Sequence, residues 1–203
     1  MDTFLIKPTI NIDYDLLNQA ISGLVLEDDT VDPNFHFNNH AQRELGWPKA
    51  SKSNDVTVLD DVRRAIKLRP EIKLTHVVLF HFKPLEAVTP HLDTTPMPWA
   101  LCIPIKSSDN LTIRWHEIIE HDSYEMSNIP FYGRNKDNKL PILSAEEASR
   151  TTKIVEEKVL SYPGILRSDV WHSATNTSDS EKVYLLRIGI PDDLSVDNSE
   201  IFY

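Results

Sequence analysis

A histidine and an aspartate stand two residues apart, His91 and Asp93, shortly before the apolar run PWALCIPI. In extended backbone, residues i and i+2 point to the same side, so these side chains can offer an imidazole nitrogen and a carboxylate oxygen to one point in space. The chain has eight histidines, so about one H-x-[DE] triplet is expected by chance. The pair therefore predicts a metal site only in combination with further ligands.

A third ligand is available in His172, which lies far downstream in the strand-like segment DVWHSAT. Two histidines and one carboxylate on one face of an octahedral metal leave three positions open, and non-haem Fe(II) oxygenases use these positions to bind a co-substrate and O₂. Zinc hydrolases use the same ligand types. The three residues by themselves leave both metals open.

An arginine interrupts a second apolar segment, VYLLRIGI. Alternation along a strand puts Leu185, Arg187 and Gly189 on one face, and if the other face meets the covering helices, Arg187 points into the barrel. An unpaired guanidinium inside a barrel is costly, so it should meet a carboxylate from the protein or from a ligand. The arginine fork suits bidentate contact with such a group, and the small Gly189 leaves room for a ligand.

The order His91-x-Asp93, His172 and then Arg187 one strand later resembles the Fe(II)/2-oxoglutarate-dependent dioxygenases. The resemblance covers Leu74 to Ile190 and leaves the N-terminal third outside it. It implies a double-stranded β-helix in which His91, Asp93 and His172 bind Fe(II), while Arg187 pairs with the distal carboxylate of 2-oxoglutarate.

The activity that this resemblance implies is oxidative decarboxylation of 2-oxoglutarate to succinate and CO₂, with O₂ consumed and a C–H bond of the substrate hydroxylated. The chain departs from the family at Gly189, because a serine or threonine often stands two residues after the arginine. The second contact to the 2-oxoglutarate carboxylate is therefore unassigned.

We expect the candidate site residues to be positioned mainly by β-strands. Short helices are predicted at 13–22 and 60–68, each opened by an aspartate that can cap it, and the polar segment 27–55 is expected to be irregular. β-Branched and aromatic runs predict strands at 75–82, 98–105, 111–118, 152–160, 169–175 and 182–190.

Turn residues at 107–110 and 177–180 predict hairpins, and Ser144 with Glu147 predicts a capping box. The pattern favours a mainly β protein with flanking helices. We expect a jelly roll or cupin-like double-stranded β-helix with the short N-terminal helices packed on one outer face.

The length of 203 residues and the hydrophobic content of 40% predict a single domain. We expect an N-terminal support region at 1–72, a jelly-roll catalytic core at 73–191 and a C-terminal tail at 192–203. The long irregular segment 120–143 is a candidate lid or binding loop.

The net charge of −10 disfavours binding to duplex nucleic acid or to an anionic membrane surface. The N-terminus has no signal-peptide pattern, and no apolar run is long enough to span a membrane. The lone Cys102 suits a reducing compartment and is expected to be a buried small hydrophobe. A cytoplasmic protein is therefore expected.

Other noticeable side chains are expected to have structural roles. Packing or surface positions are expected for His36, His40, His76, His81, Trp99, Trp115, Trp171, Arg114 and Arg167, with Tyr162 a weaker pocket candidate. Three hypotheses remain open: a 2-oxoglutarate-dependent hydroxylase of an amino acid, small metabolite or peptide, a cupin-like metalloenzyme that uses no oxoacid, and a noncatalytic jelly-roll binding or structural protein.

Overall fold

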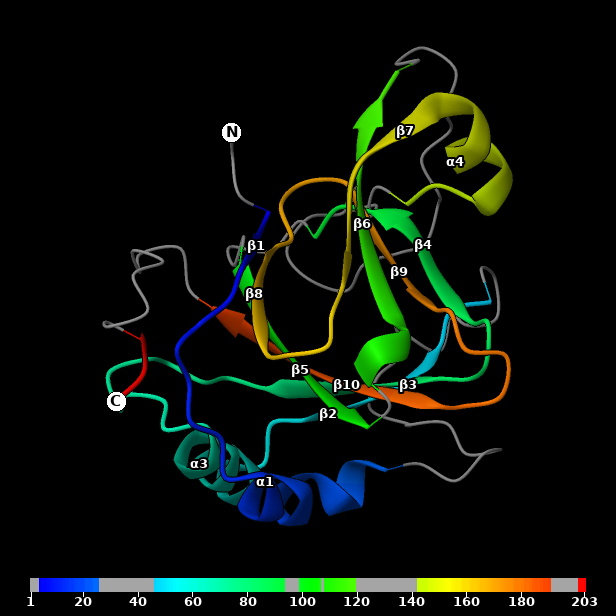
Figure 1. Cartoon of the computed structure of the whole chain (residues 1–203). Coiled ribbons are helices and arrows are strands. Elements are labelled where there is room, and N and C mark those ends of the chain that lie inside the picture. Colours follow the sequence, from blue (N-terminus) through cyan, green and yellow to red (C-terminus); the bar gives the residue numbers. More distant parts are fainter. Residues whose placement is uncertain (1–3, 26–45, 94–98, 107, 120–141, 191–200) are drawn as a thin grey trace, which may run out of the picture.

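Two antiparallel β-sheets form the core of the chain (Figure 1). The computed structural model describes residues 4–25, 46–93, 99–106, 108–119, 142–190 and 201–203. The six-stranded sheet has the order β1-β8-β5-β10-β3-β2, and the four-stranded sheet has the order β4-β9-β6-β7. The strands are β1 (Leu5–Ile6), β2 (Lys49–Ser53), β3 (Val77–Phe82), β4 (Ala87–His91), β5 (Trp99–Lys106), β6 (Leu111–Ile118), β7 (Thr152–Val159), β8 (Gly164–Arg167), β9 (His172–Asn176) and β10 (Val183–Ile190).

From β3 to β10 the chain changes sheet at every connection except that between β6 and β7, which pair with each other. β3, β5, β8 and β10 lie in the larger sheet, and β4, β6, β7 and β9 lie in the smaller one. Neighbouring strands pair antiparallel throughout. This arrangement is a double-stranded β-helix, or jelly roll, as the sequence predicted.

The two segments predicted to be hairpin turns are corners between the sheets, so that prediction was wrong. The short helix η2 (Ser108–Asn110) joins β5 to β6, and 177–180 joins β9 to β10, but the strands of each pair lie in different sheets. Ser, Asp and Asn favour a reversal of the chain whether or not the flanking strands pair with each other. The turn residues therefore located the reversals without identifying the strand partners.

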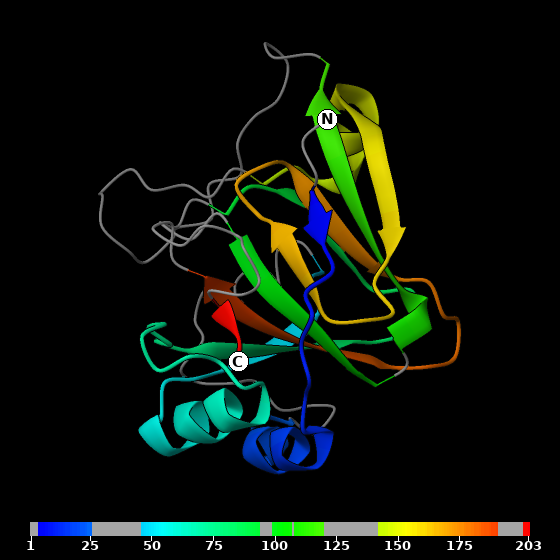
Figure 2. The same ribbon diagram turned by 60° about the vertical axis from the view of Figure 1, so that its left-hand side comes forward.

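Two helices, α1 (Tyr14–Ile21) and α3 (Val56–Ala65), cover the outer face of the larger sheet (Figure 2). Asp13 caps α1 as expected, with its carboxylate accepting from the Leu16 amide. The start predicted for the second helix, at residue 60, was wrong, because Asp55 accepts from the Thr57 and Val58 amides and begins α3 earlier. Residue 55 was predicted to end the irregular segment, whereas the buried side chain of Leu59 belongs to the first turns of α3.

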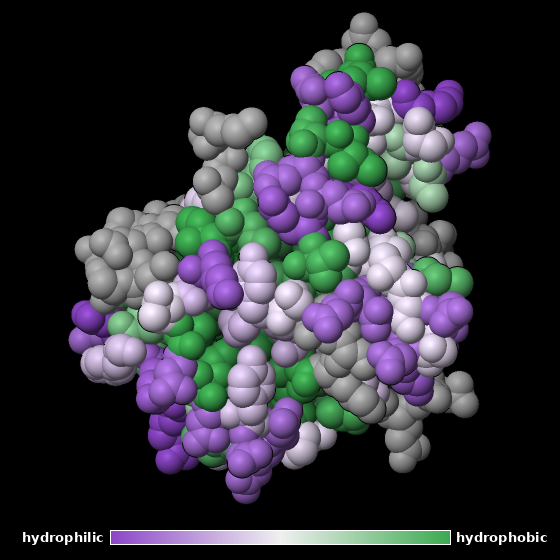
Figure 3. Space-filling model, in the orientation of Figure 1, coloured by the Kyte–Doolittle hydropathy of each residue, from purple (hydrophilic) through white to green (hydrophobic). Residues whose placement is uncertain are grey.

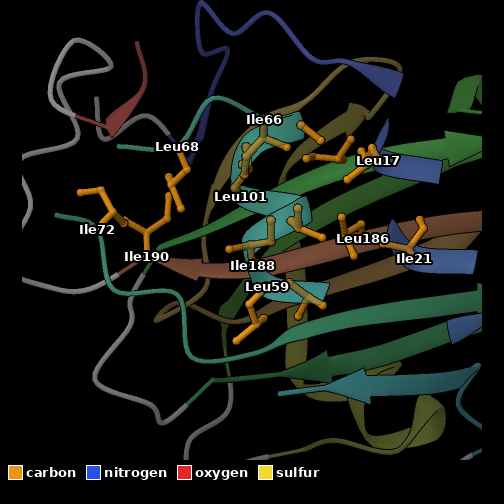
Figure 4. Packing of buried hydrophobic residues seen from close by; sticks show 14 of the residues in the cluster. Leu17, Ile21, Leu59, Ile66, Leu68, Ile72, Leu101, Leu186, Ile188 and Ile190 are labelled. Carbon is orange, nitrogen blue, oxygen red and sulfur yellow. The ribbon is translucent and has the colours of Figure 1, made fainter. Parts of the chain in front are cut away.

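Apolar side chains fill the layer between these helices and the sheet (Figure 4). Each fully buried leucine or isoleucine contributes about 1.5–3 kcal/mol. The end of the chain joins the same layer, where Ile201 and Phe202 are buried and Phe202 forms a β-bridge with Leu68. The cluster includes Leu17, Ile21, Leu59, Leu101, Leu186 and Ile188.

Part of the segment predicted to be irregular is a strand. Lys49–Ser53 forms β2, which pairs with β3 at the edge of the larger sheet. The letters KASKS lack β-branched and aromatic residues, so no strand pattern was visible. Gly164–Arg167, β8, was missed because only four residues carry it. The capping box of α4 (Ala145–Thr151) is confirmed, with Ser144 and Glu147 bonded reciprocally.

Within the described part of the chain, no helix combines the length and apolar character needed to cross a membrane. On the face seen in Figure 3, hydrophobic residues lie between hydrophilic ones.

The turn between β3 and β4 generates a stability prediction. Leu85 has a φ of 60° and is 66% exposed, and a left-handed backbone costs a residue with a side chain about 1–2 kcal/mol. Leu85→Gly should raise the free energy of unfolding by about 0.5–1 kcal/mol. Glycine removes the cost of the left-handed backbone, but its greater entropy in the unfolded chain offsets part of that gain. Urea unfolding measures the change. Leu85→Ala keeps the backbone penalty, and equal stability of the two variants would contradict the interpretation.

Candidate metal centre

The two histidines are direct partners across neighbouring strands. His91 ends β4 and His172 begins β9, and the register of the antiparallel pair sets them opposite each other. Directly opposed residues project to the same side of a sheet at close separation. The imidazole centroids are accordingly 4.2 Å apart, and each histidine is only 8% exposed.

The backbone fixes which nitrogen each histidine presents. His91 Nδ1 lies 2.9 Å from the Thr89 carbonyl oxygen, and His172 Nδ1 lies 2.9 Å from the Val170 carbonyl oxygen. A carbonyl oxygen only accepts, so each Nδ1 carries a proton and each Nε2 has its lone pair available. Both rings are therefore in the tautomer that ligates a metal through Nε2.

Asp93 follows β4 and places its carboxylate beside the histidines. Its backbone amide donates to the Ser168 carbonyl at 3.0 Å, which ties the chain after β4 to the segment before β9. Asp93 Oδ1 is 3.7 Å from His91 Nε2. One ligand atom from each of His91, Asp93 and His172 lies within 4.8 Å of the others. The structure thus brings together all three residues singled out in the sequence.

Arg187 reaches this group from the larger sheet. It stands in β10 between Val78 of β3 and Cys102 of β5, and its neighbour Leu185 belongs to the cluster between the sheets. Leu186 and Ile188 instead face the helices. The alternation predicted from the sequence is confirmed, and Arg187 points inward, where its Nη2 donates to Asp93 Oδ2 in an ion pair.

Burial and neighbouring charge keep the site in the protonation state that binds metal. Burial, and then His172, lower the pKa of His91 to about 3, and burial also lowers the pKa of His172. Burial alone would raise the pKa of the Asp93 carboxyl, but Arg187 and the two histidines outweigh it and lower the value to about 2. At neutral pH the site holds two neutral imidazoles and one carboxylate.

This donor set fits a mononuclear divalent metal. The donor atoms of the two histidines and Asp93 lie within 4.8 Å of one another, and Oδ2 of the carboxylate is held by Arg187. Ligands on one face leave the opposite side for exogenous molecules, as in the facial arrangement of non-haem iron enzymes. The donor types and their spacing therefore fit a metal ion.

The remaining side chains noted in the sequence have packing or surface contacts, and two of them, Trp115 and Cys102, are strand partners of His172 and Arg187. His81 bonds the Leu24 carbonyl on the helix-facing side. Arg114 pairs with Glu157 and Arg167 pairs with Asp169, as expected for salt-bridged surface arginines. The ring of Tyr162 lies under Lys7. Trp99 packs on the helix side and Trp115 is buried between the sheets. Cys102 is buried as expected, and burial raises the pKa of its thiol to about 12.

His36 and His40 lie outside the described residues, as does 120–141 of the proposed lid. The end of that segment is described, and it reaches the site. Ile142 forms an isolated β-bridge with His91, and the Leu143 amide donates to the Pro90 carbonyl at 2.9 Å. A lid role for the segment stays a prediction.

Three residues around the site were missed in the sequence. Trp47 packs on the His91 ring, Thr89 bonds both Trp47 and His91, and the hydroxyl of Ser168 hydrogen-bonds Asp93. Thr89 stands two residues before His91, where an i−2 carbonyl partner could have been anticipated. No sequence pattern marks Trp47 or Ser168, because tertiary folding alone brings them to the ligands.

The chain is similar in outline to several solved structures. A viral collagen prolyl hydroxylase from Paramecium bursaria Chlorella virus-1, in complex with 2-oxoglutarate, has 10% identity and a TM-score of 0.42 over 93% of this chain and 95% of that one. A prolyl-4-hydroxylase from Pseudomonas putida has 9% identity and a TM-score of 0.39 over 93% and 92%. HygX from Streptomyces hygroscopicus, with nickel, 2-oxoglutarate and hygromycin B bound, has 12% identity and a TM-score of 0.41 over 94% and 83%.

No family model matches the chain, and no curated protein matches it in sequence. Identities this low leave the function to be inferred from the side chains of this chain.

The lowered pKa values predict that metal binding releases almost no protons. An ordinary histidine has a pKa of about 6.5 and is largely protonated at pH 6, whereas His91 has a pKa of about 3 and that of His172 is also lowered. His91 is thus already deprotonated at pH 6 and the lowered pKa of His172 favours its neutral form, so Co²⁺ titrated calorimetrically at pH 6 in buffers of different ionisation enthalpy should give nearly the same heat. Release of one or more protons would contradict this.

The ion pair predicts a metal-dependent effect of Arg187→Met. Removing one partner of a fully buried pair costs about 3–5 kcal/mol, and the side chains here are 21% and 17% exposed. We expect the free energy of unfolding of the metal-free protein to fall by about 2 kcal/mol, because water screens part of the charge. With saturating Co²⁺, the fall in the free energy of unfolding should be smaller, because the bound metal would provide Asp93 with a positive partner in place of Arg187.

Arg114→Met is the matched control, because Arg114 pairs with Glu157 on the surface. Its loss should cost about 0–1 kcal/mol with and without Co²⁺. Urea unfolding of both variants, each with and without metal, tests the expectation. Equal losses for Arg187→Met in the two conditions would contradict it.

Proposed function

We propose that the protein is an Fe(II)- and 2-oxoglutarate-dependent oxygenase that hydroxylates a C–H bond of an amino acid, small metabolite or peptide side chain. The observation that carries the proposal is the convergence of His91, Asp93 and His172, with ligand atoms within 4.8 Å, beside the inward-pointing Arg187. Bound iron would supply activation of O₂ coupled to decarboxylation of 2-oxoglutarate to succinate and CO₂.

The residues divide the work between holding the metal and orienting the oxoacid. His91 and His172 would each give an Nε2, fixed by the bonds from Nδ1 to backbone carbonyls, and Asp93 would give Oδ1. With a metal bound, Asp93 would share its charge with the ion and would hold Arg187 less tightly. The guanidinium can then turn to the distal carboxylate of 2-oxoglutarate, a partner that its fork fits in a bidentate manner.

The pairing of Arg187 with Asp93 also favours a second candidate. The sequence required some carboxylate partner for the inward arginine, and Asp93 already satisfies that requirement. A cupin-like metalloenzyme that uses the triad without an oxoacid would keep Arg187 on Asp93 throughout. The two candidates differ in whether 2-oxoglutarate binds to the metal-loaded protein.

Anaerobic titration tests the proposal. Adding 2-oxoglutarate to the Fe(II)-loaded protein should produce a visible charge-transfer band if the oxoacid binds at the iron. Admitting O₂ should then give succinate, and the amount of succinate should depend on both Fe(II) and substrate. Iron binding without a band would favour the second candidate, and the absence of iron binding would leave only a noncatalytic jelly roll.

His172→Ala should lower metal affinity by more than about a hundredfold, which exceeds the loss typical of an outer-shell partner, and should abolish the band. His116→Gln is the matched control on the same sheet, because His116 faces outward and bonds the Ser173 hydroxyl. A His172→Ala protein that keeps the band, or a His116→Gln protein that loses it, would contradict the assignment.

A further inference from the structure

A tryptophan from outside the predicted catalytic core is linked to a proposed metal ligand through one threonine. Trp47 Nε1 donates to Thr89 Oγ1 at 3.0 Å. The carbonyl oxygen of the same Thr89 accepts from His91 Nδ1 at 2.9 Å. Thr89 therefore connects the indole to the imidazole with its side chain on one side and its backbone on the other.

The two rings are also in direct contact. The Trp47 and His91 centroids are 4.9 Å apart at an interplanar angle of 56°. The His91 ring also lies beside the ring of His172, with centroids 4.2 Å apart. Any rotation of the His91 ring about its side-chain bonds must therefore displace either the indole or the second histidine.

Burial makes this contact rigid. Trp47 is 3% exposed and belongs to the cluster between the sheets. A buried indole N–H without an acceptor is costly, so Thr89 Oγ1 holds the ring in place. Trp47 precedes β2, while Thr89 and His91 lie in β4 of the other sheet. The link thus joins segments that are distant in the sequence and lie on opposite sheets.

The second histidine is held differently. His172 has the corresponding bond to a carbonyl two residues upstream, but that residue is Val170, whose side chain has no hydroxyl to receive an indole N–H. The residue opposite His172 on β6 is Trp115. The Trp115 Nε1 donates to the Arg167 carbonyl and not to a residue that bonds His172. A change at Trp47 or Thr89 should therefore affect His91 before His172.

We propose that Trp47 and Thr89 are positioning residues that set the orientation of His91 and, through it, the affinity of the metal site. The proposal rests on the metal centre of the proposed function and is independent of 2-oxoglutarate and O₂. It assigns part of the N-terminal third to the site, where the sequence indicated only support.

Co²⁺ binding to the metal-free protein, measured by calorimetry or by competition with a chromophoric chelator, tests the proposal. Trp47→Phe and Thr89→Val should each lower the affinity for Co²⁺ about tenfold. This is the smaller end of the loss seen when a residue that supports a metal ligand is changed. Thr89→Ser keeps the hydroxyl and should bind as the wild type does. The double variant Trp47→Phe/Thr89→Val should bind Co²⁺ no more weakly than the weaker-binding single variant. Each change removes the same hydrogen bond, so their effects should not add.

Trp99→Phe is the matched control, since Trp99 packs on the helix-facing side of the larger sheet. It should leave Co²⁺ affinity unchanged. Wild-type protein that fails to bind Co²⁺ would contradict the metal centre itself. Wild-type binding with unchanged affinity in Trp47→Phe and Thr89→Val would instead overturn only the positioning role. If Trp47→Phe does not fold, Thr89→Val against Thr89→Ser decides the question.

Paramagnetic NMR of the Co²⁺ protein separates positioning from a general loss of structure. Each ligating imidazole gives a far-shifted, exchangeable Nδ1–H resonance, and the one that disappears in His91→Gln belongs to His91. Thr89→Val should move the His91 resonance and leave that of His172 in place. Equal movement of both resonances, or movement of neither, would overturn the proposal.

Discussion

A carboxylate buried between two sheets needs a positive partner, and this requirement organises the whole site. Asp93 follows a strand of the smaller sheet, and Arg187 projects from the middle of the larger one. Their ion pair therefore connects the sheets at the point where the histidines meet. It also holds Asp93 ionised, while burial holds both imidazoles neutral. The fold thus holds one carboxylate and two neutral imidazoles close together, at the cost of burying charge.

The backbone contributes as much to this set as the side chains do. Both histidines bond a carbonyl two residues earlier, which fixes the same tautomer twice. The pairing of β4 with β9 shifts register between Val88 and His91. Such irregularities re-aim a side chain locally, and here the strand ends in the residue that must meet His172. The geometry of the donors is therefore a property of the strand pair.

The sequence predicted the features that follow from alternation along a strand. The shared side of His91 and Asp93, and the inward direction of Arg187, both follow from a period of two residues. Strand partners did not follow, so the corners at 107–110 and 177–180 were mistaken for hairpins. Short elements such as Lys49–Ser53 carry too little pattern to detect. The ligand assignments themselves remain predictions, because convergence of donors is necessary for metal binding but does not demonstrate it.

The N-terminal third has a larger part in the site than its sequence suggested. β2 extends the larger sheet beside β3, where Ala50 is buried opposite Phe80. These contacts fix the segment that carries Trp47, which in turn packs on His91. A proposed ligand placed at the end of a strand needs support from rigid neighbours to stay within the narrow geometry that metals require. In this chain Trp47, which precedes the region of family resemblance, packs on the proposed ligand His91, so the jelly-roll strands alone do not enclose the candidate site.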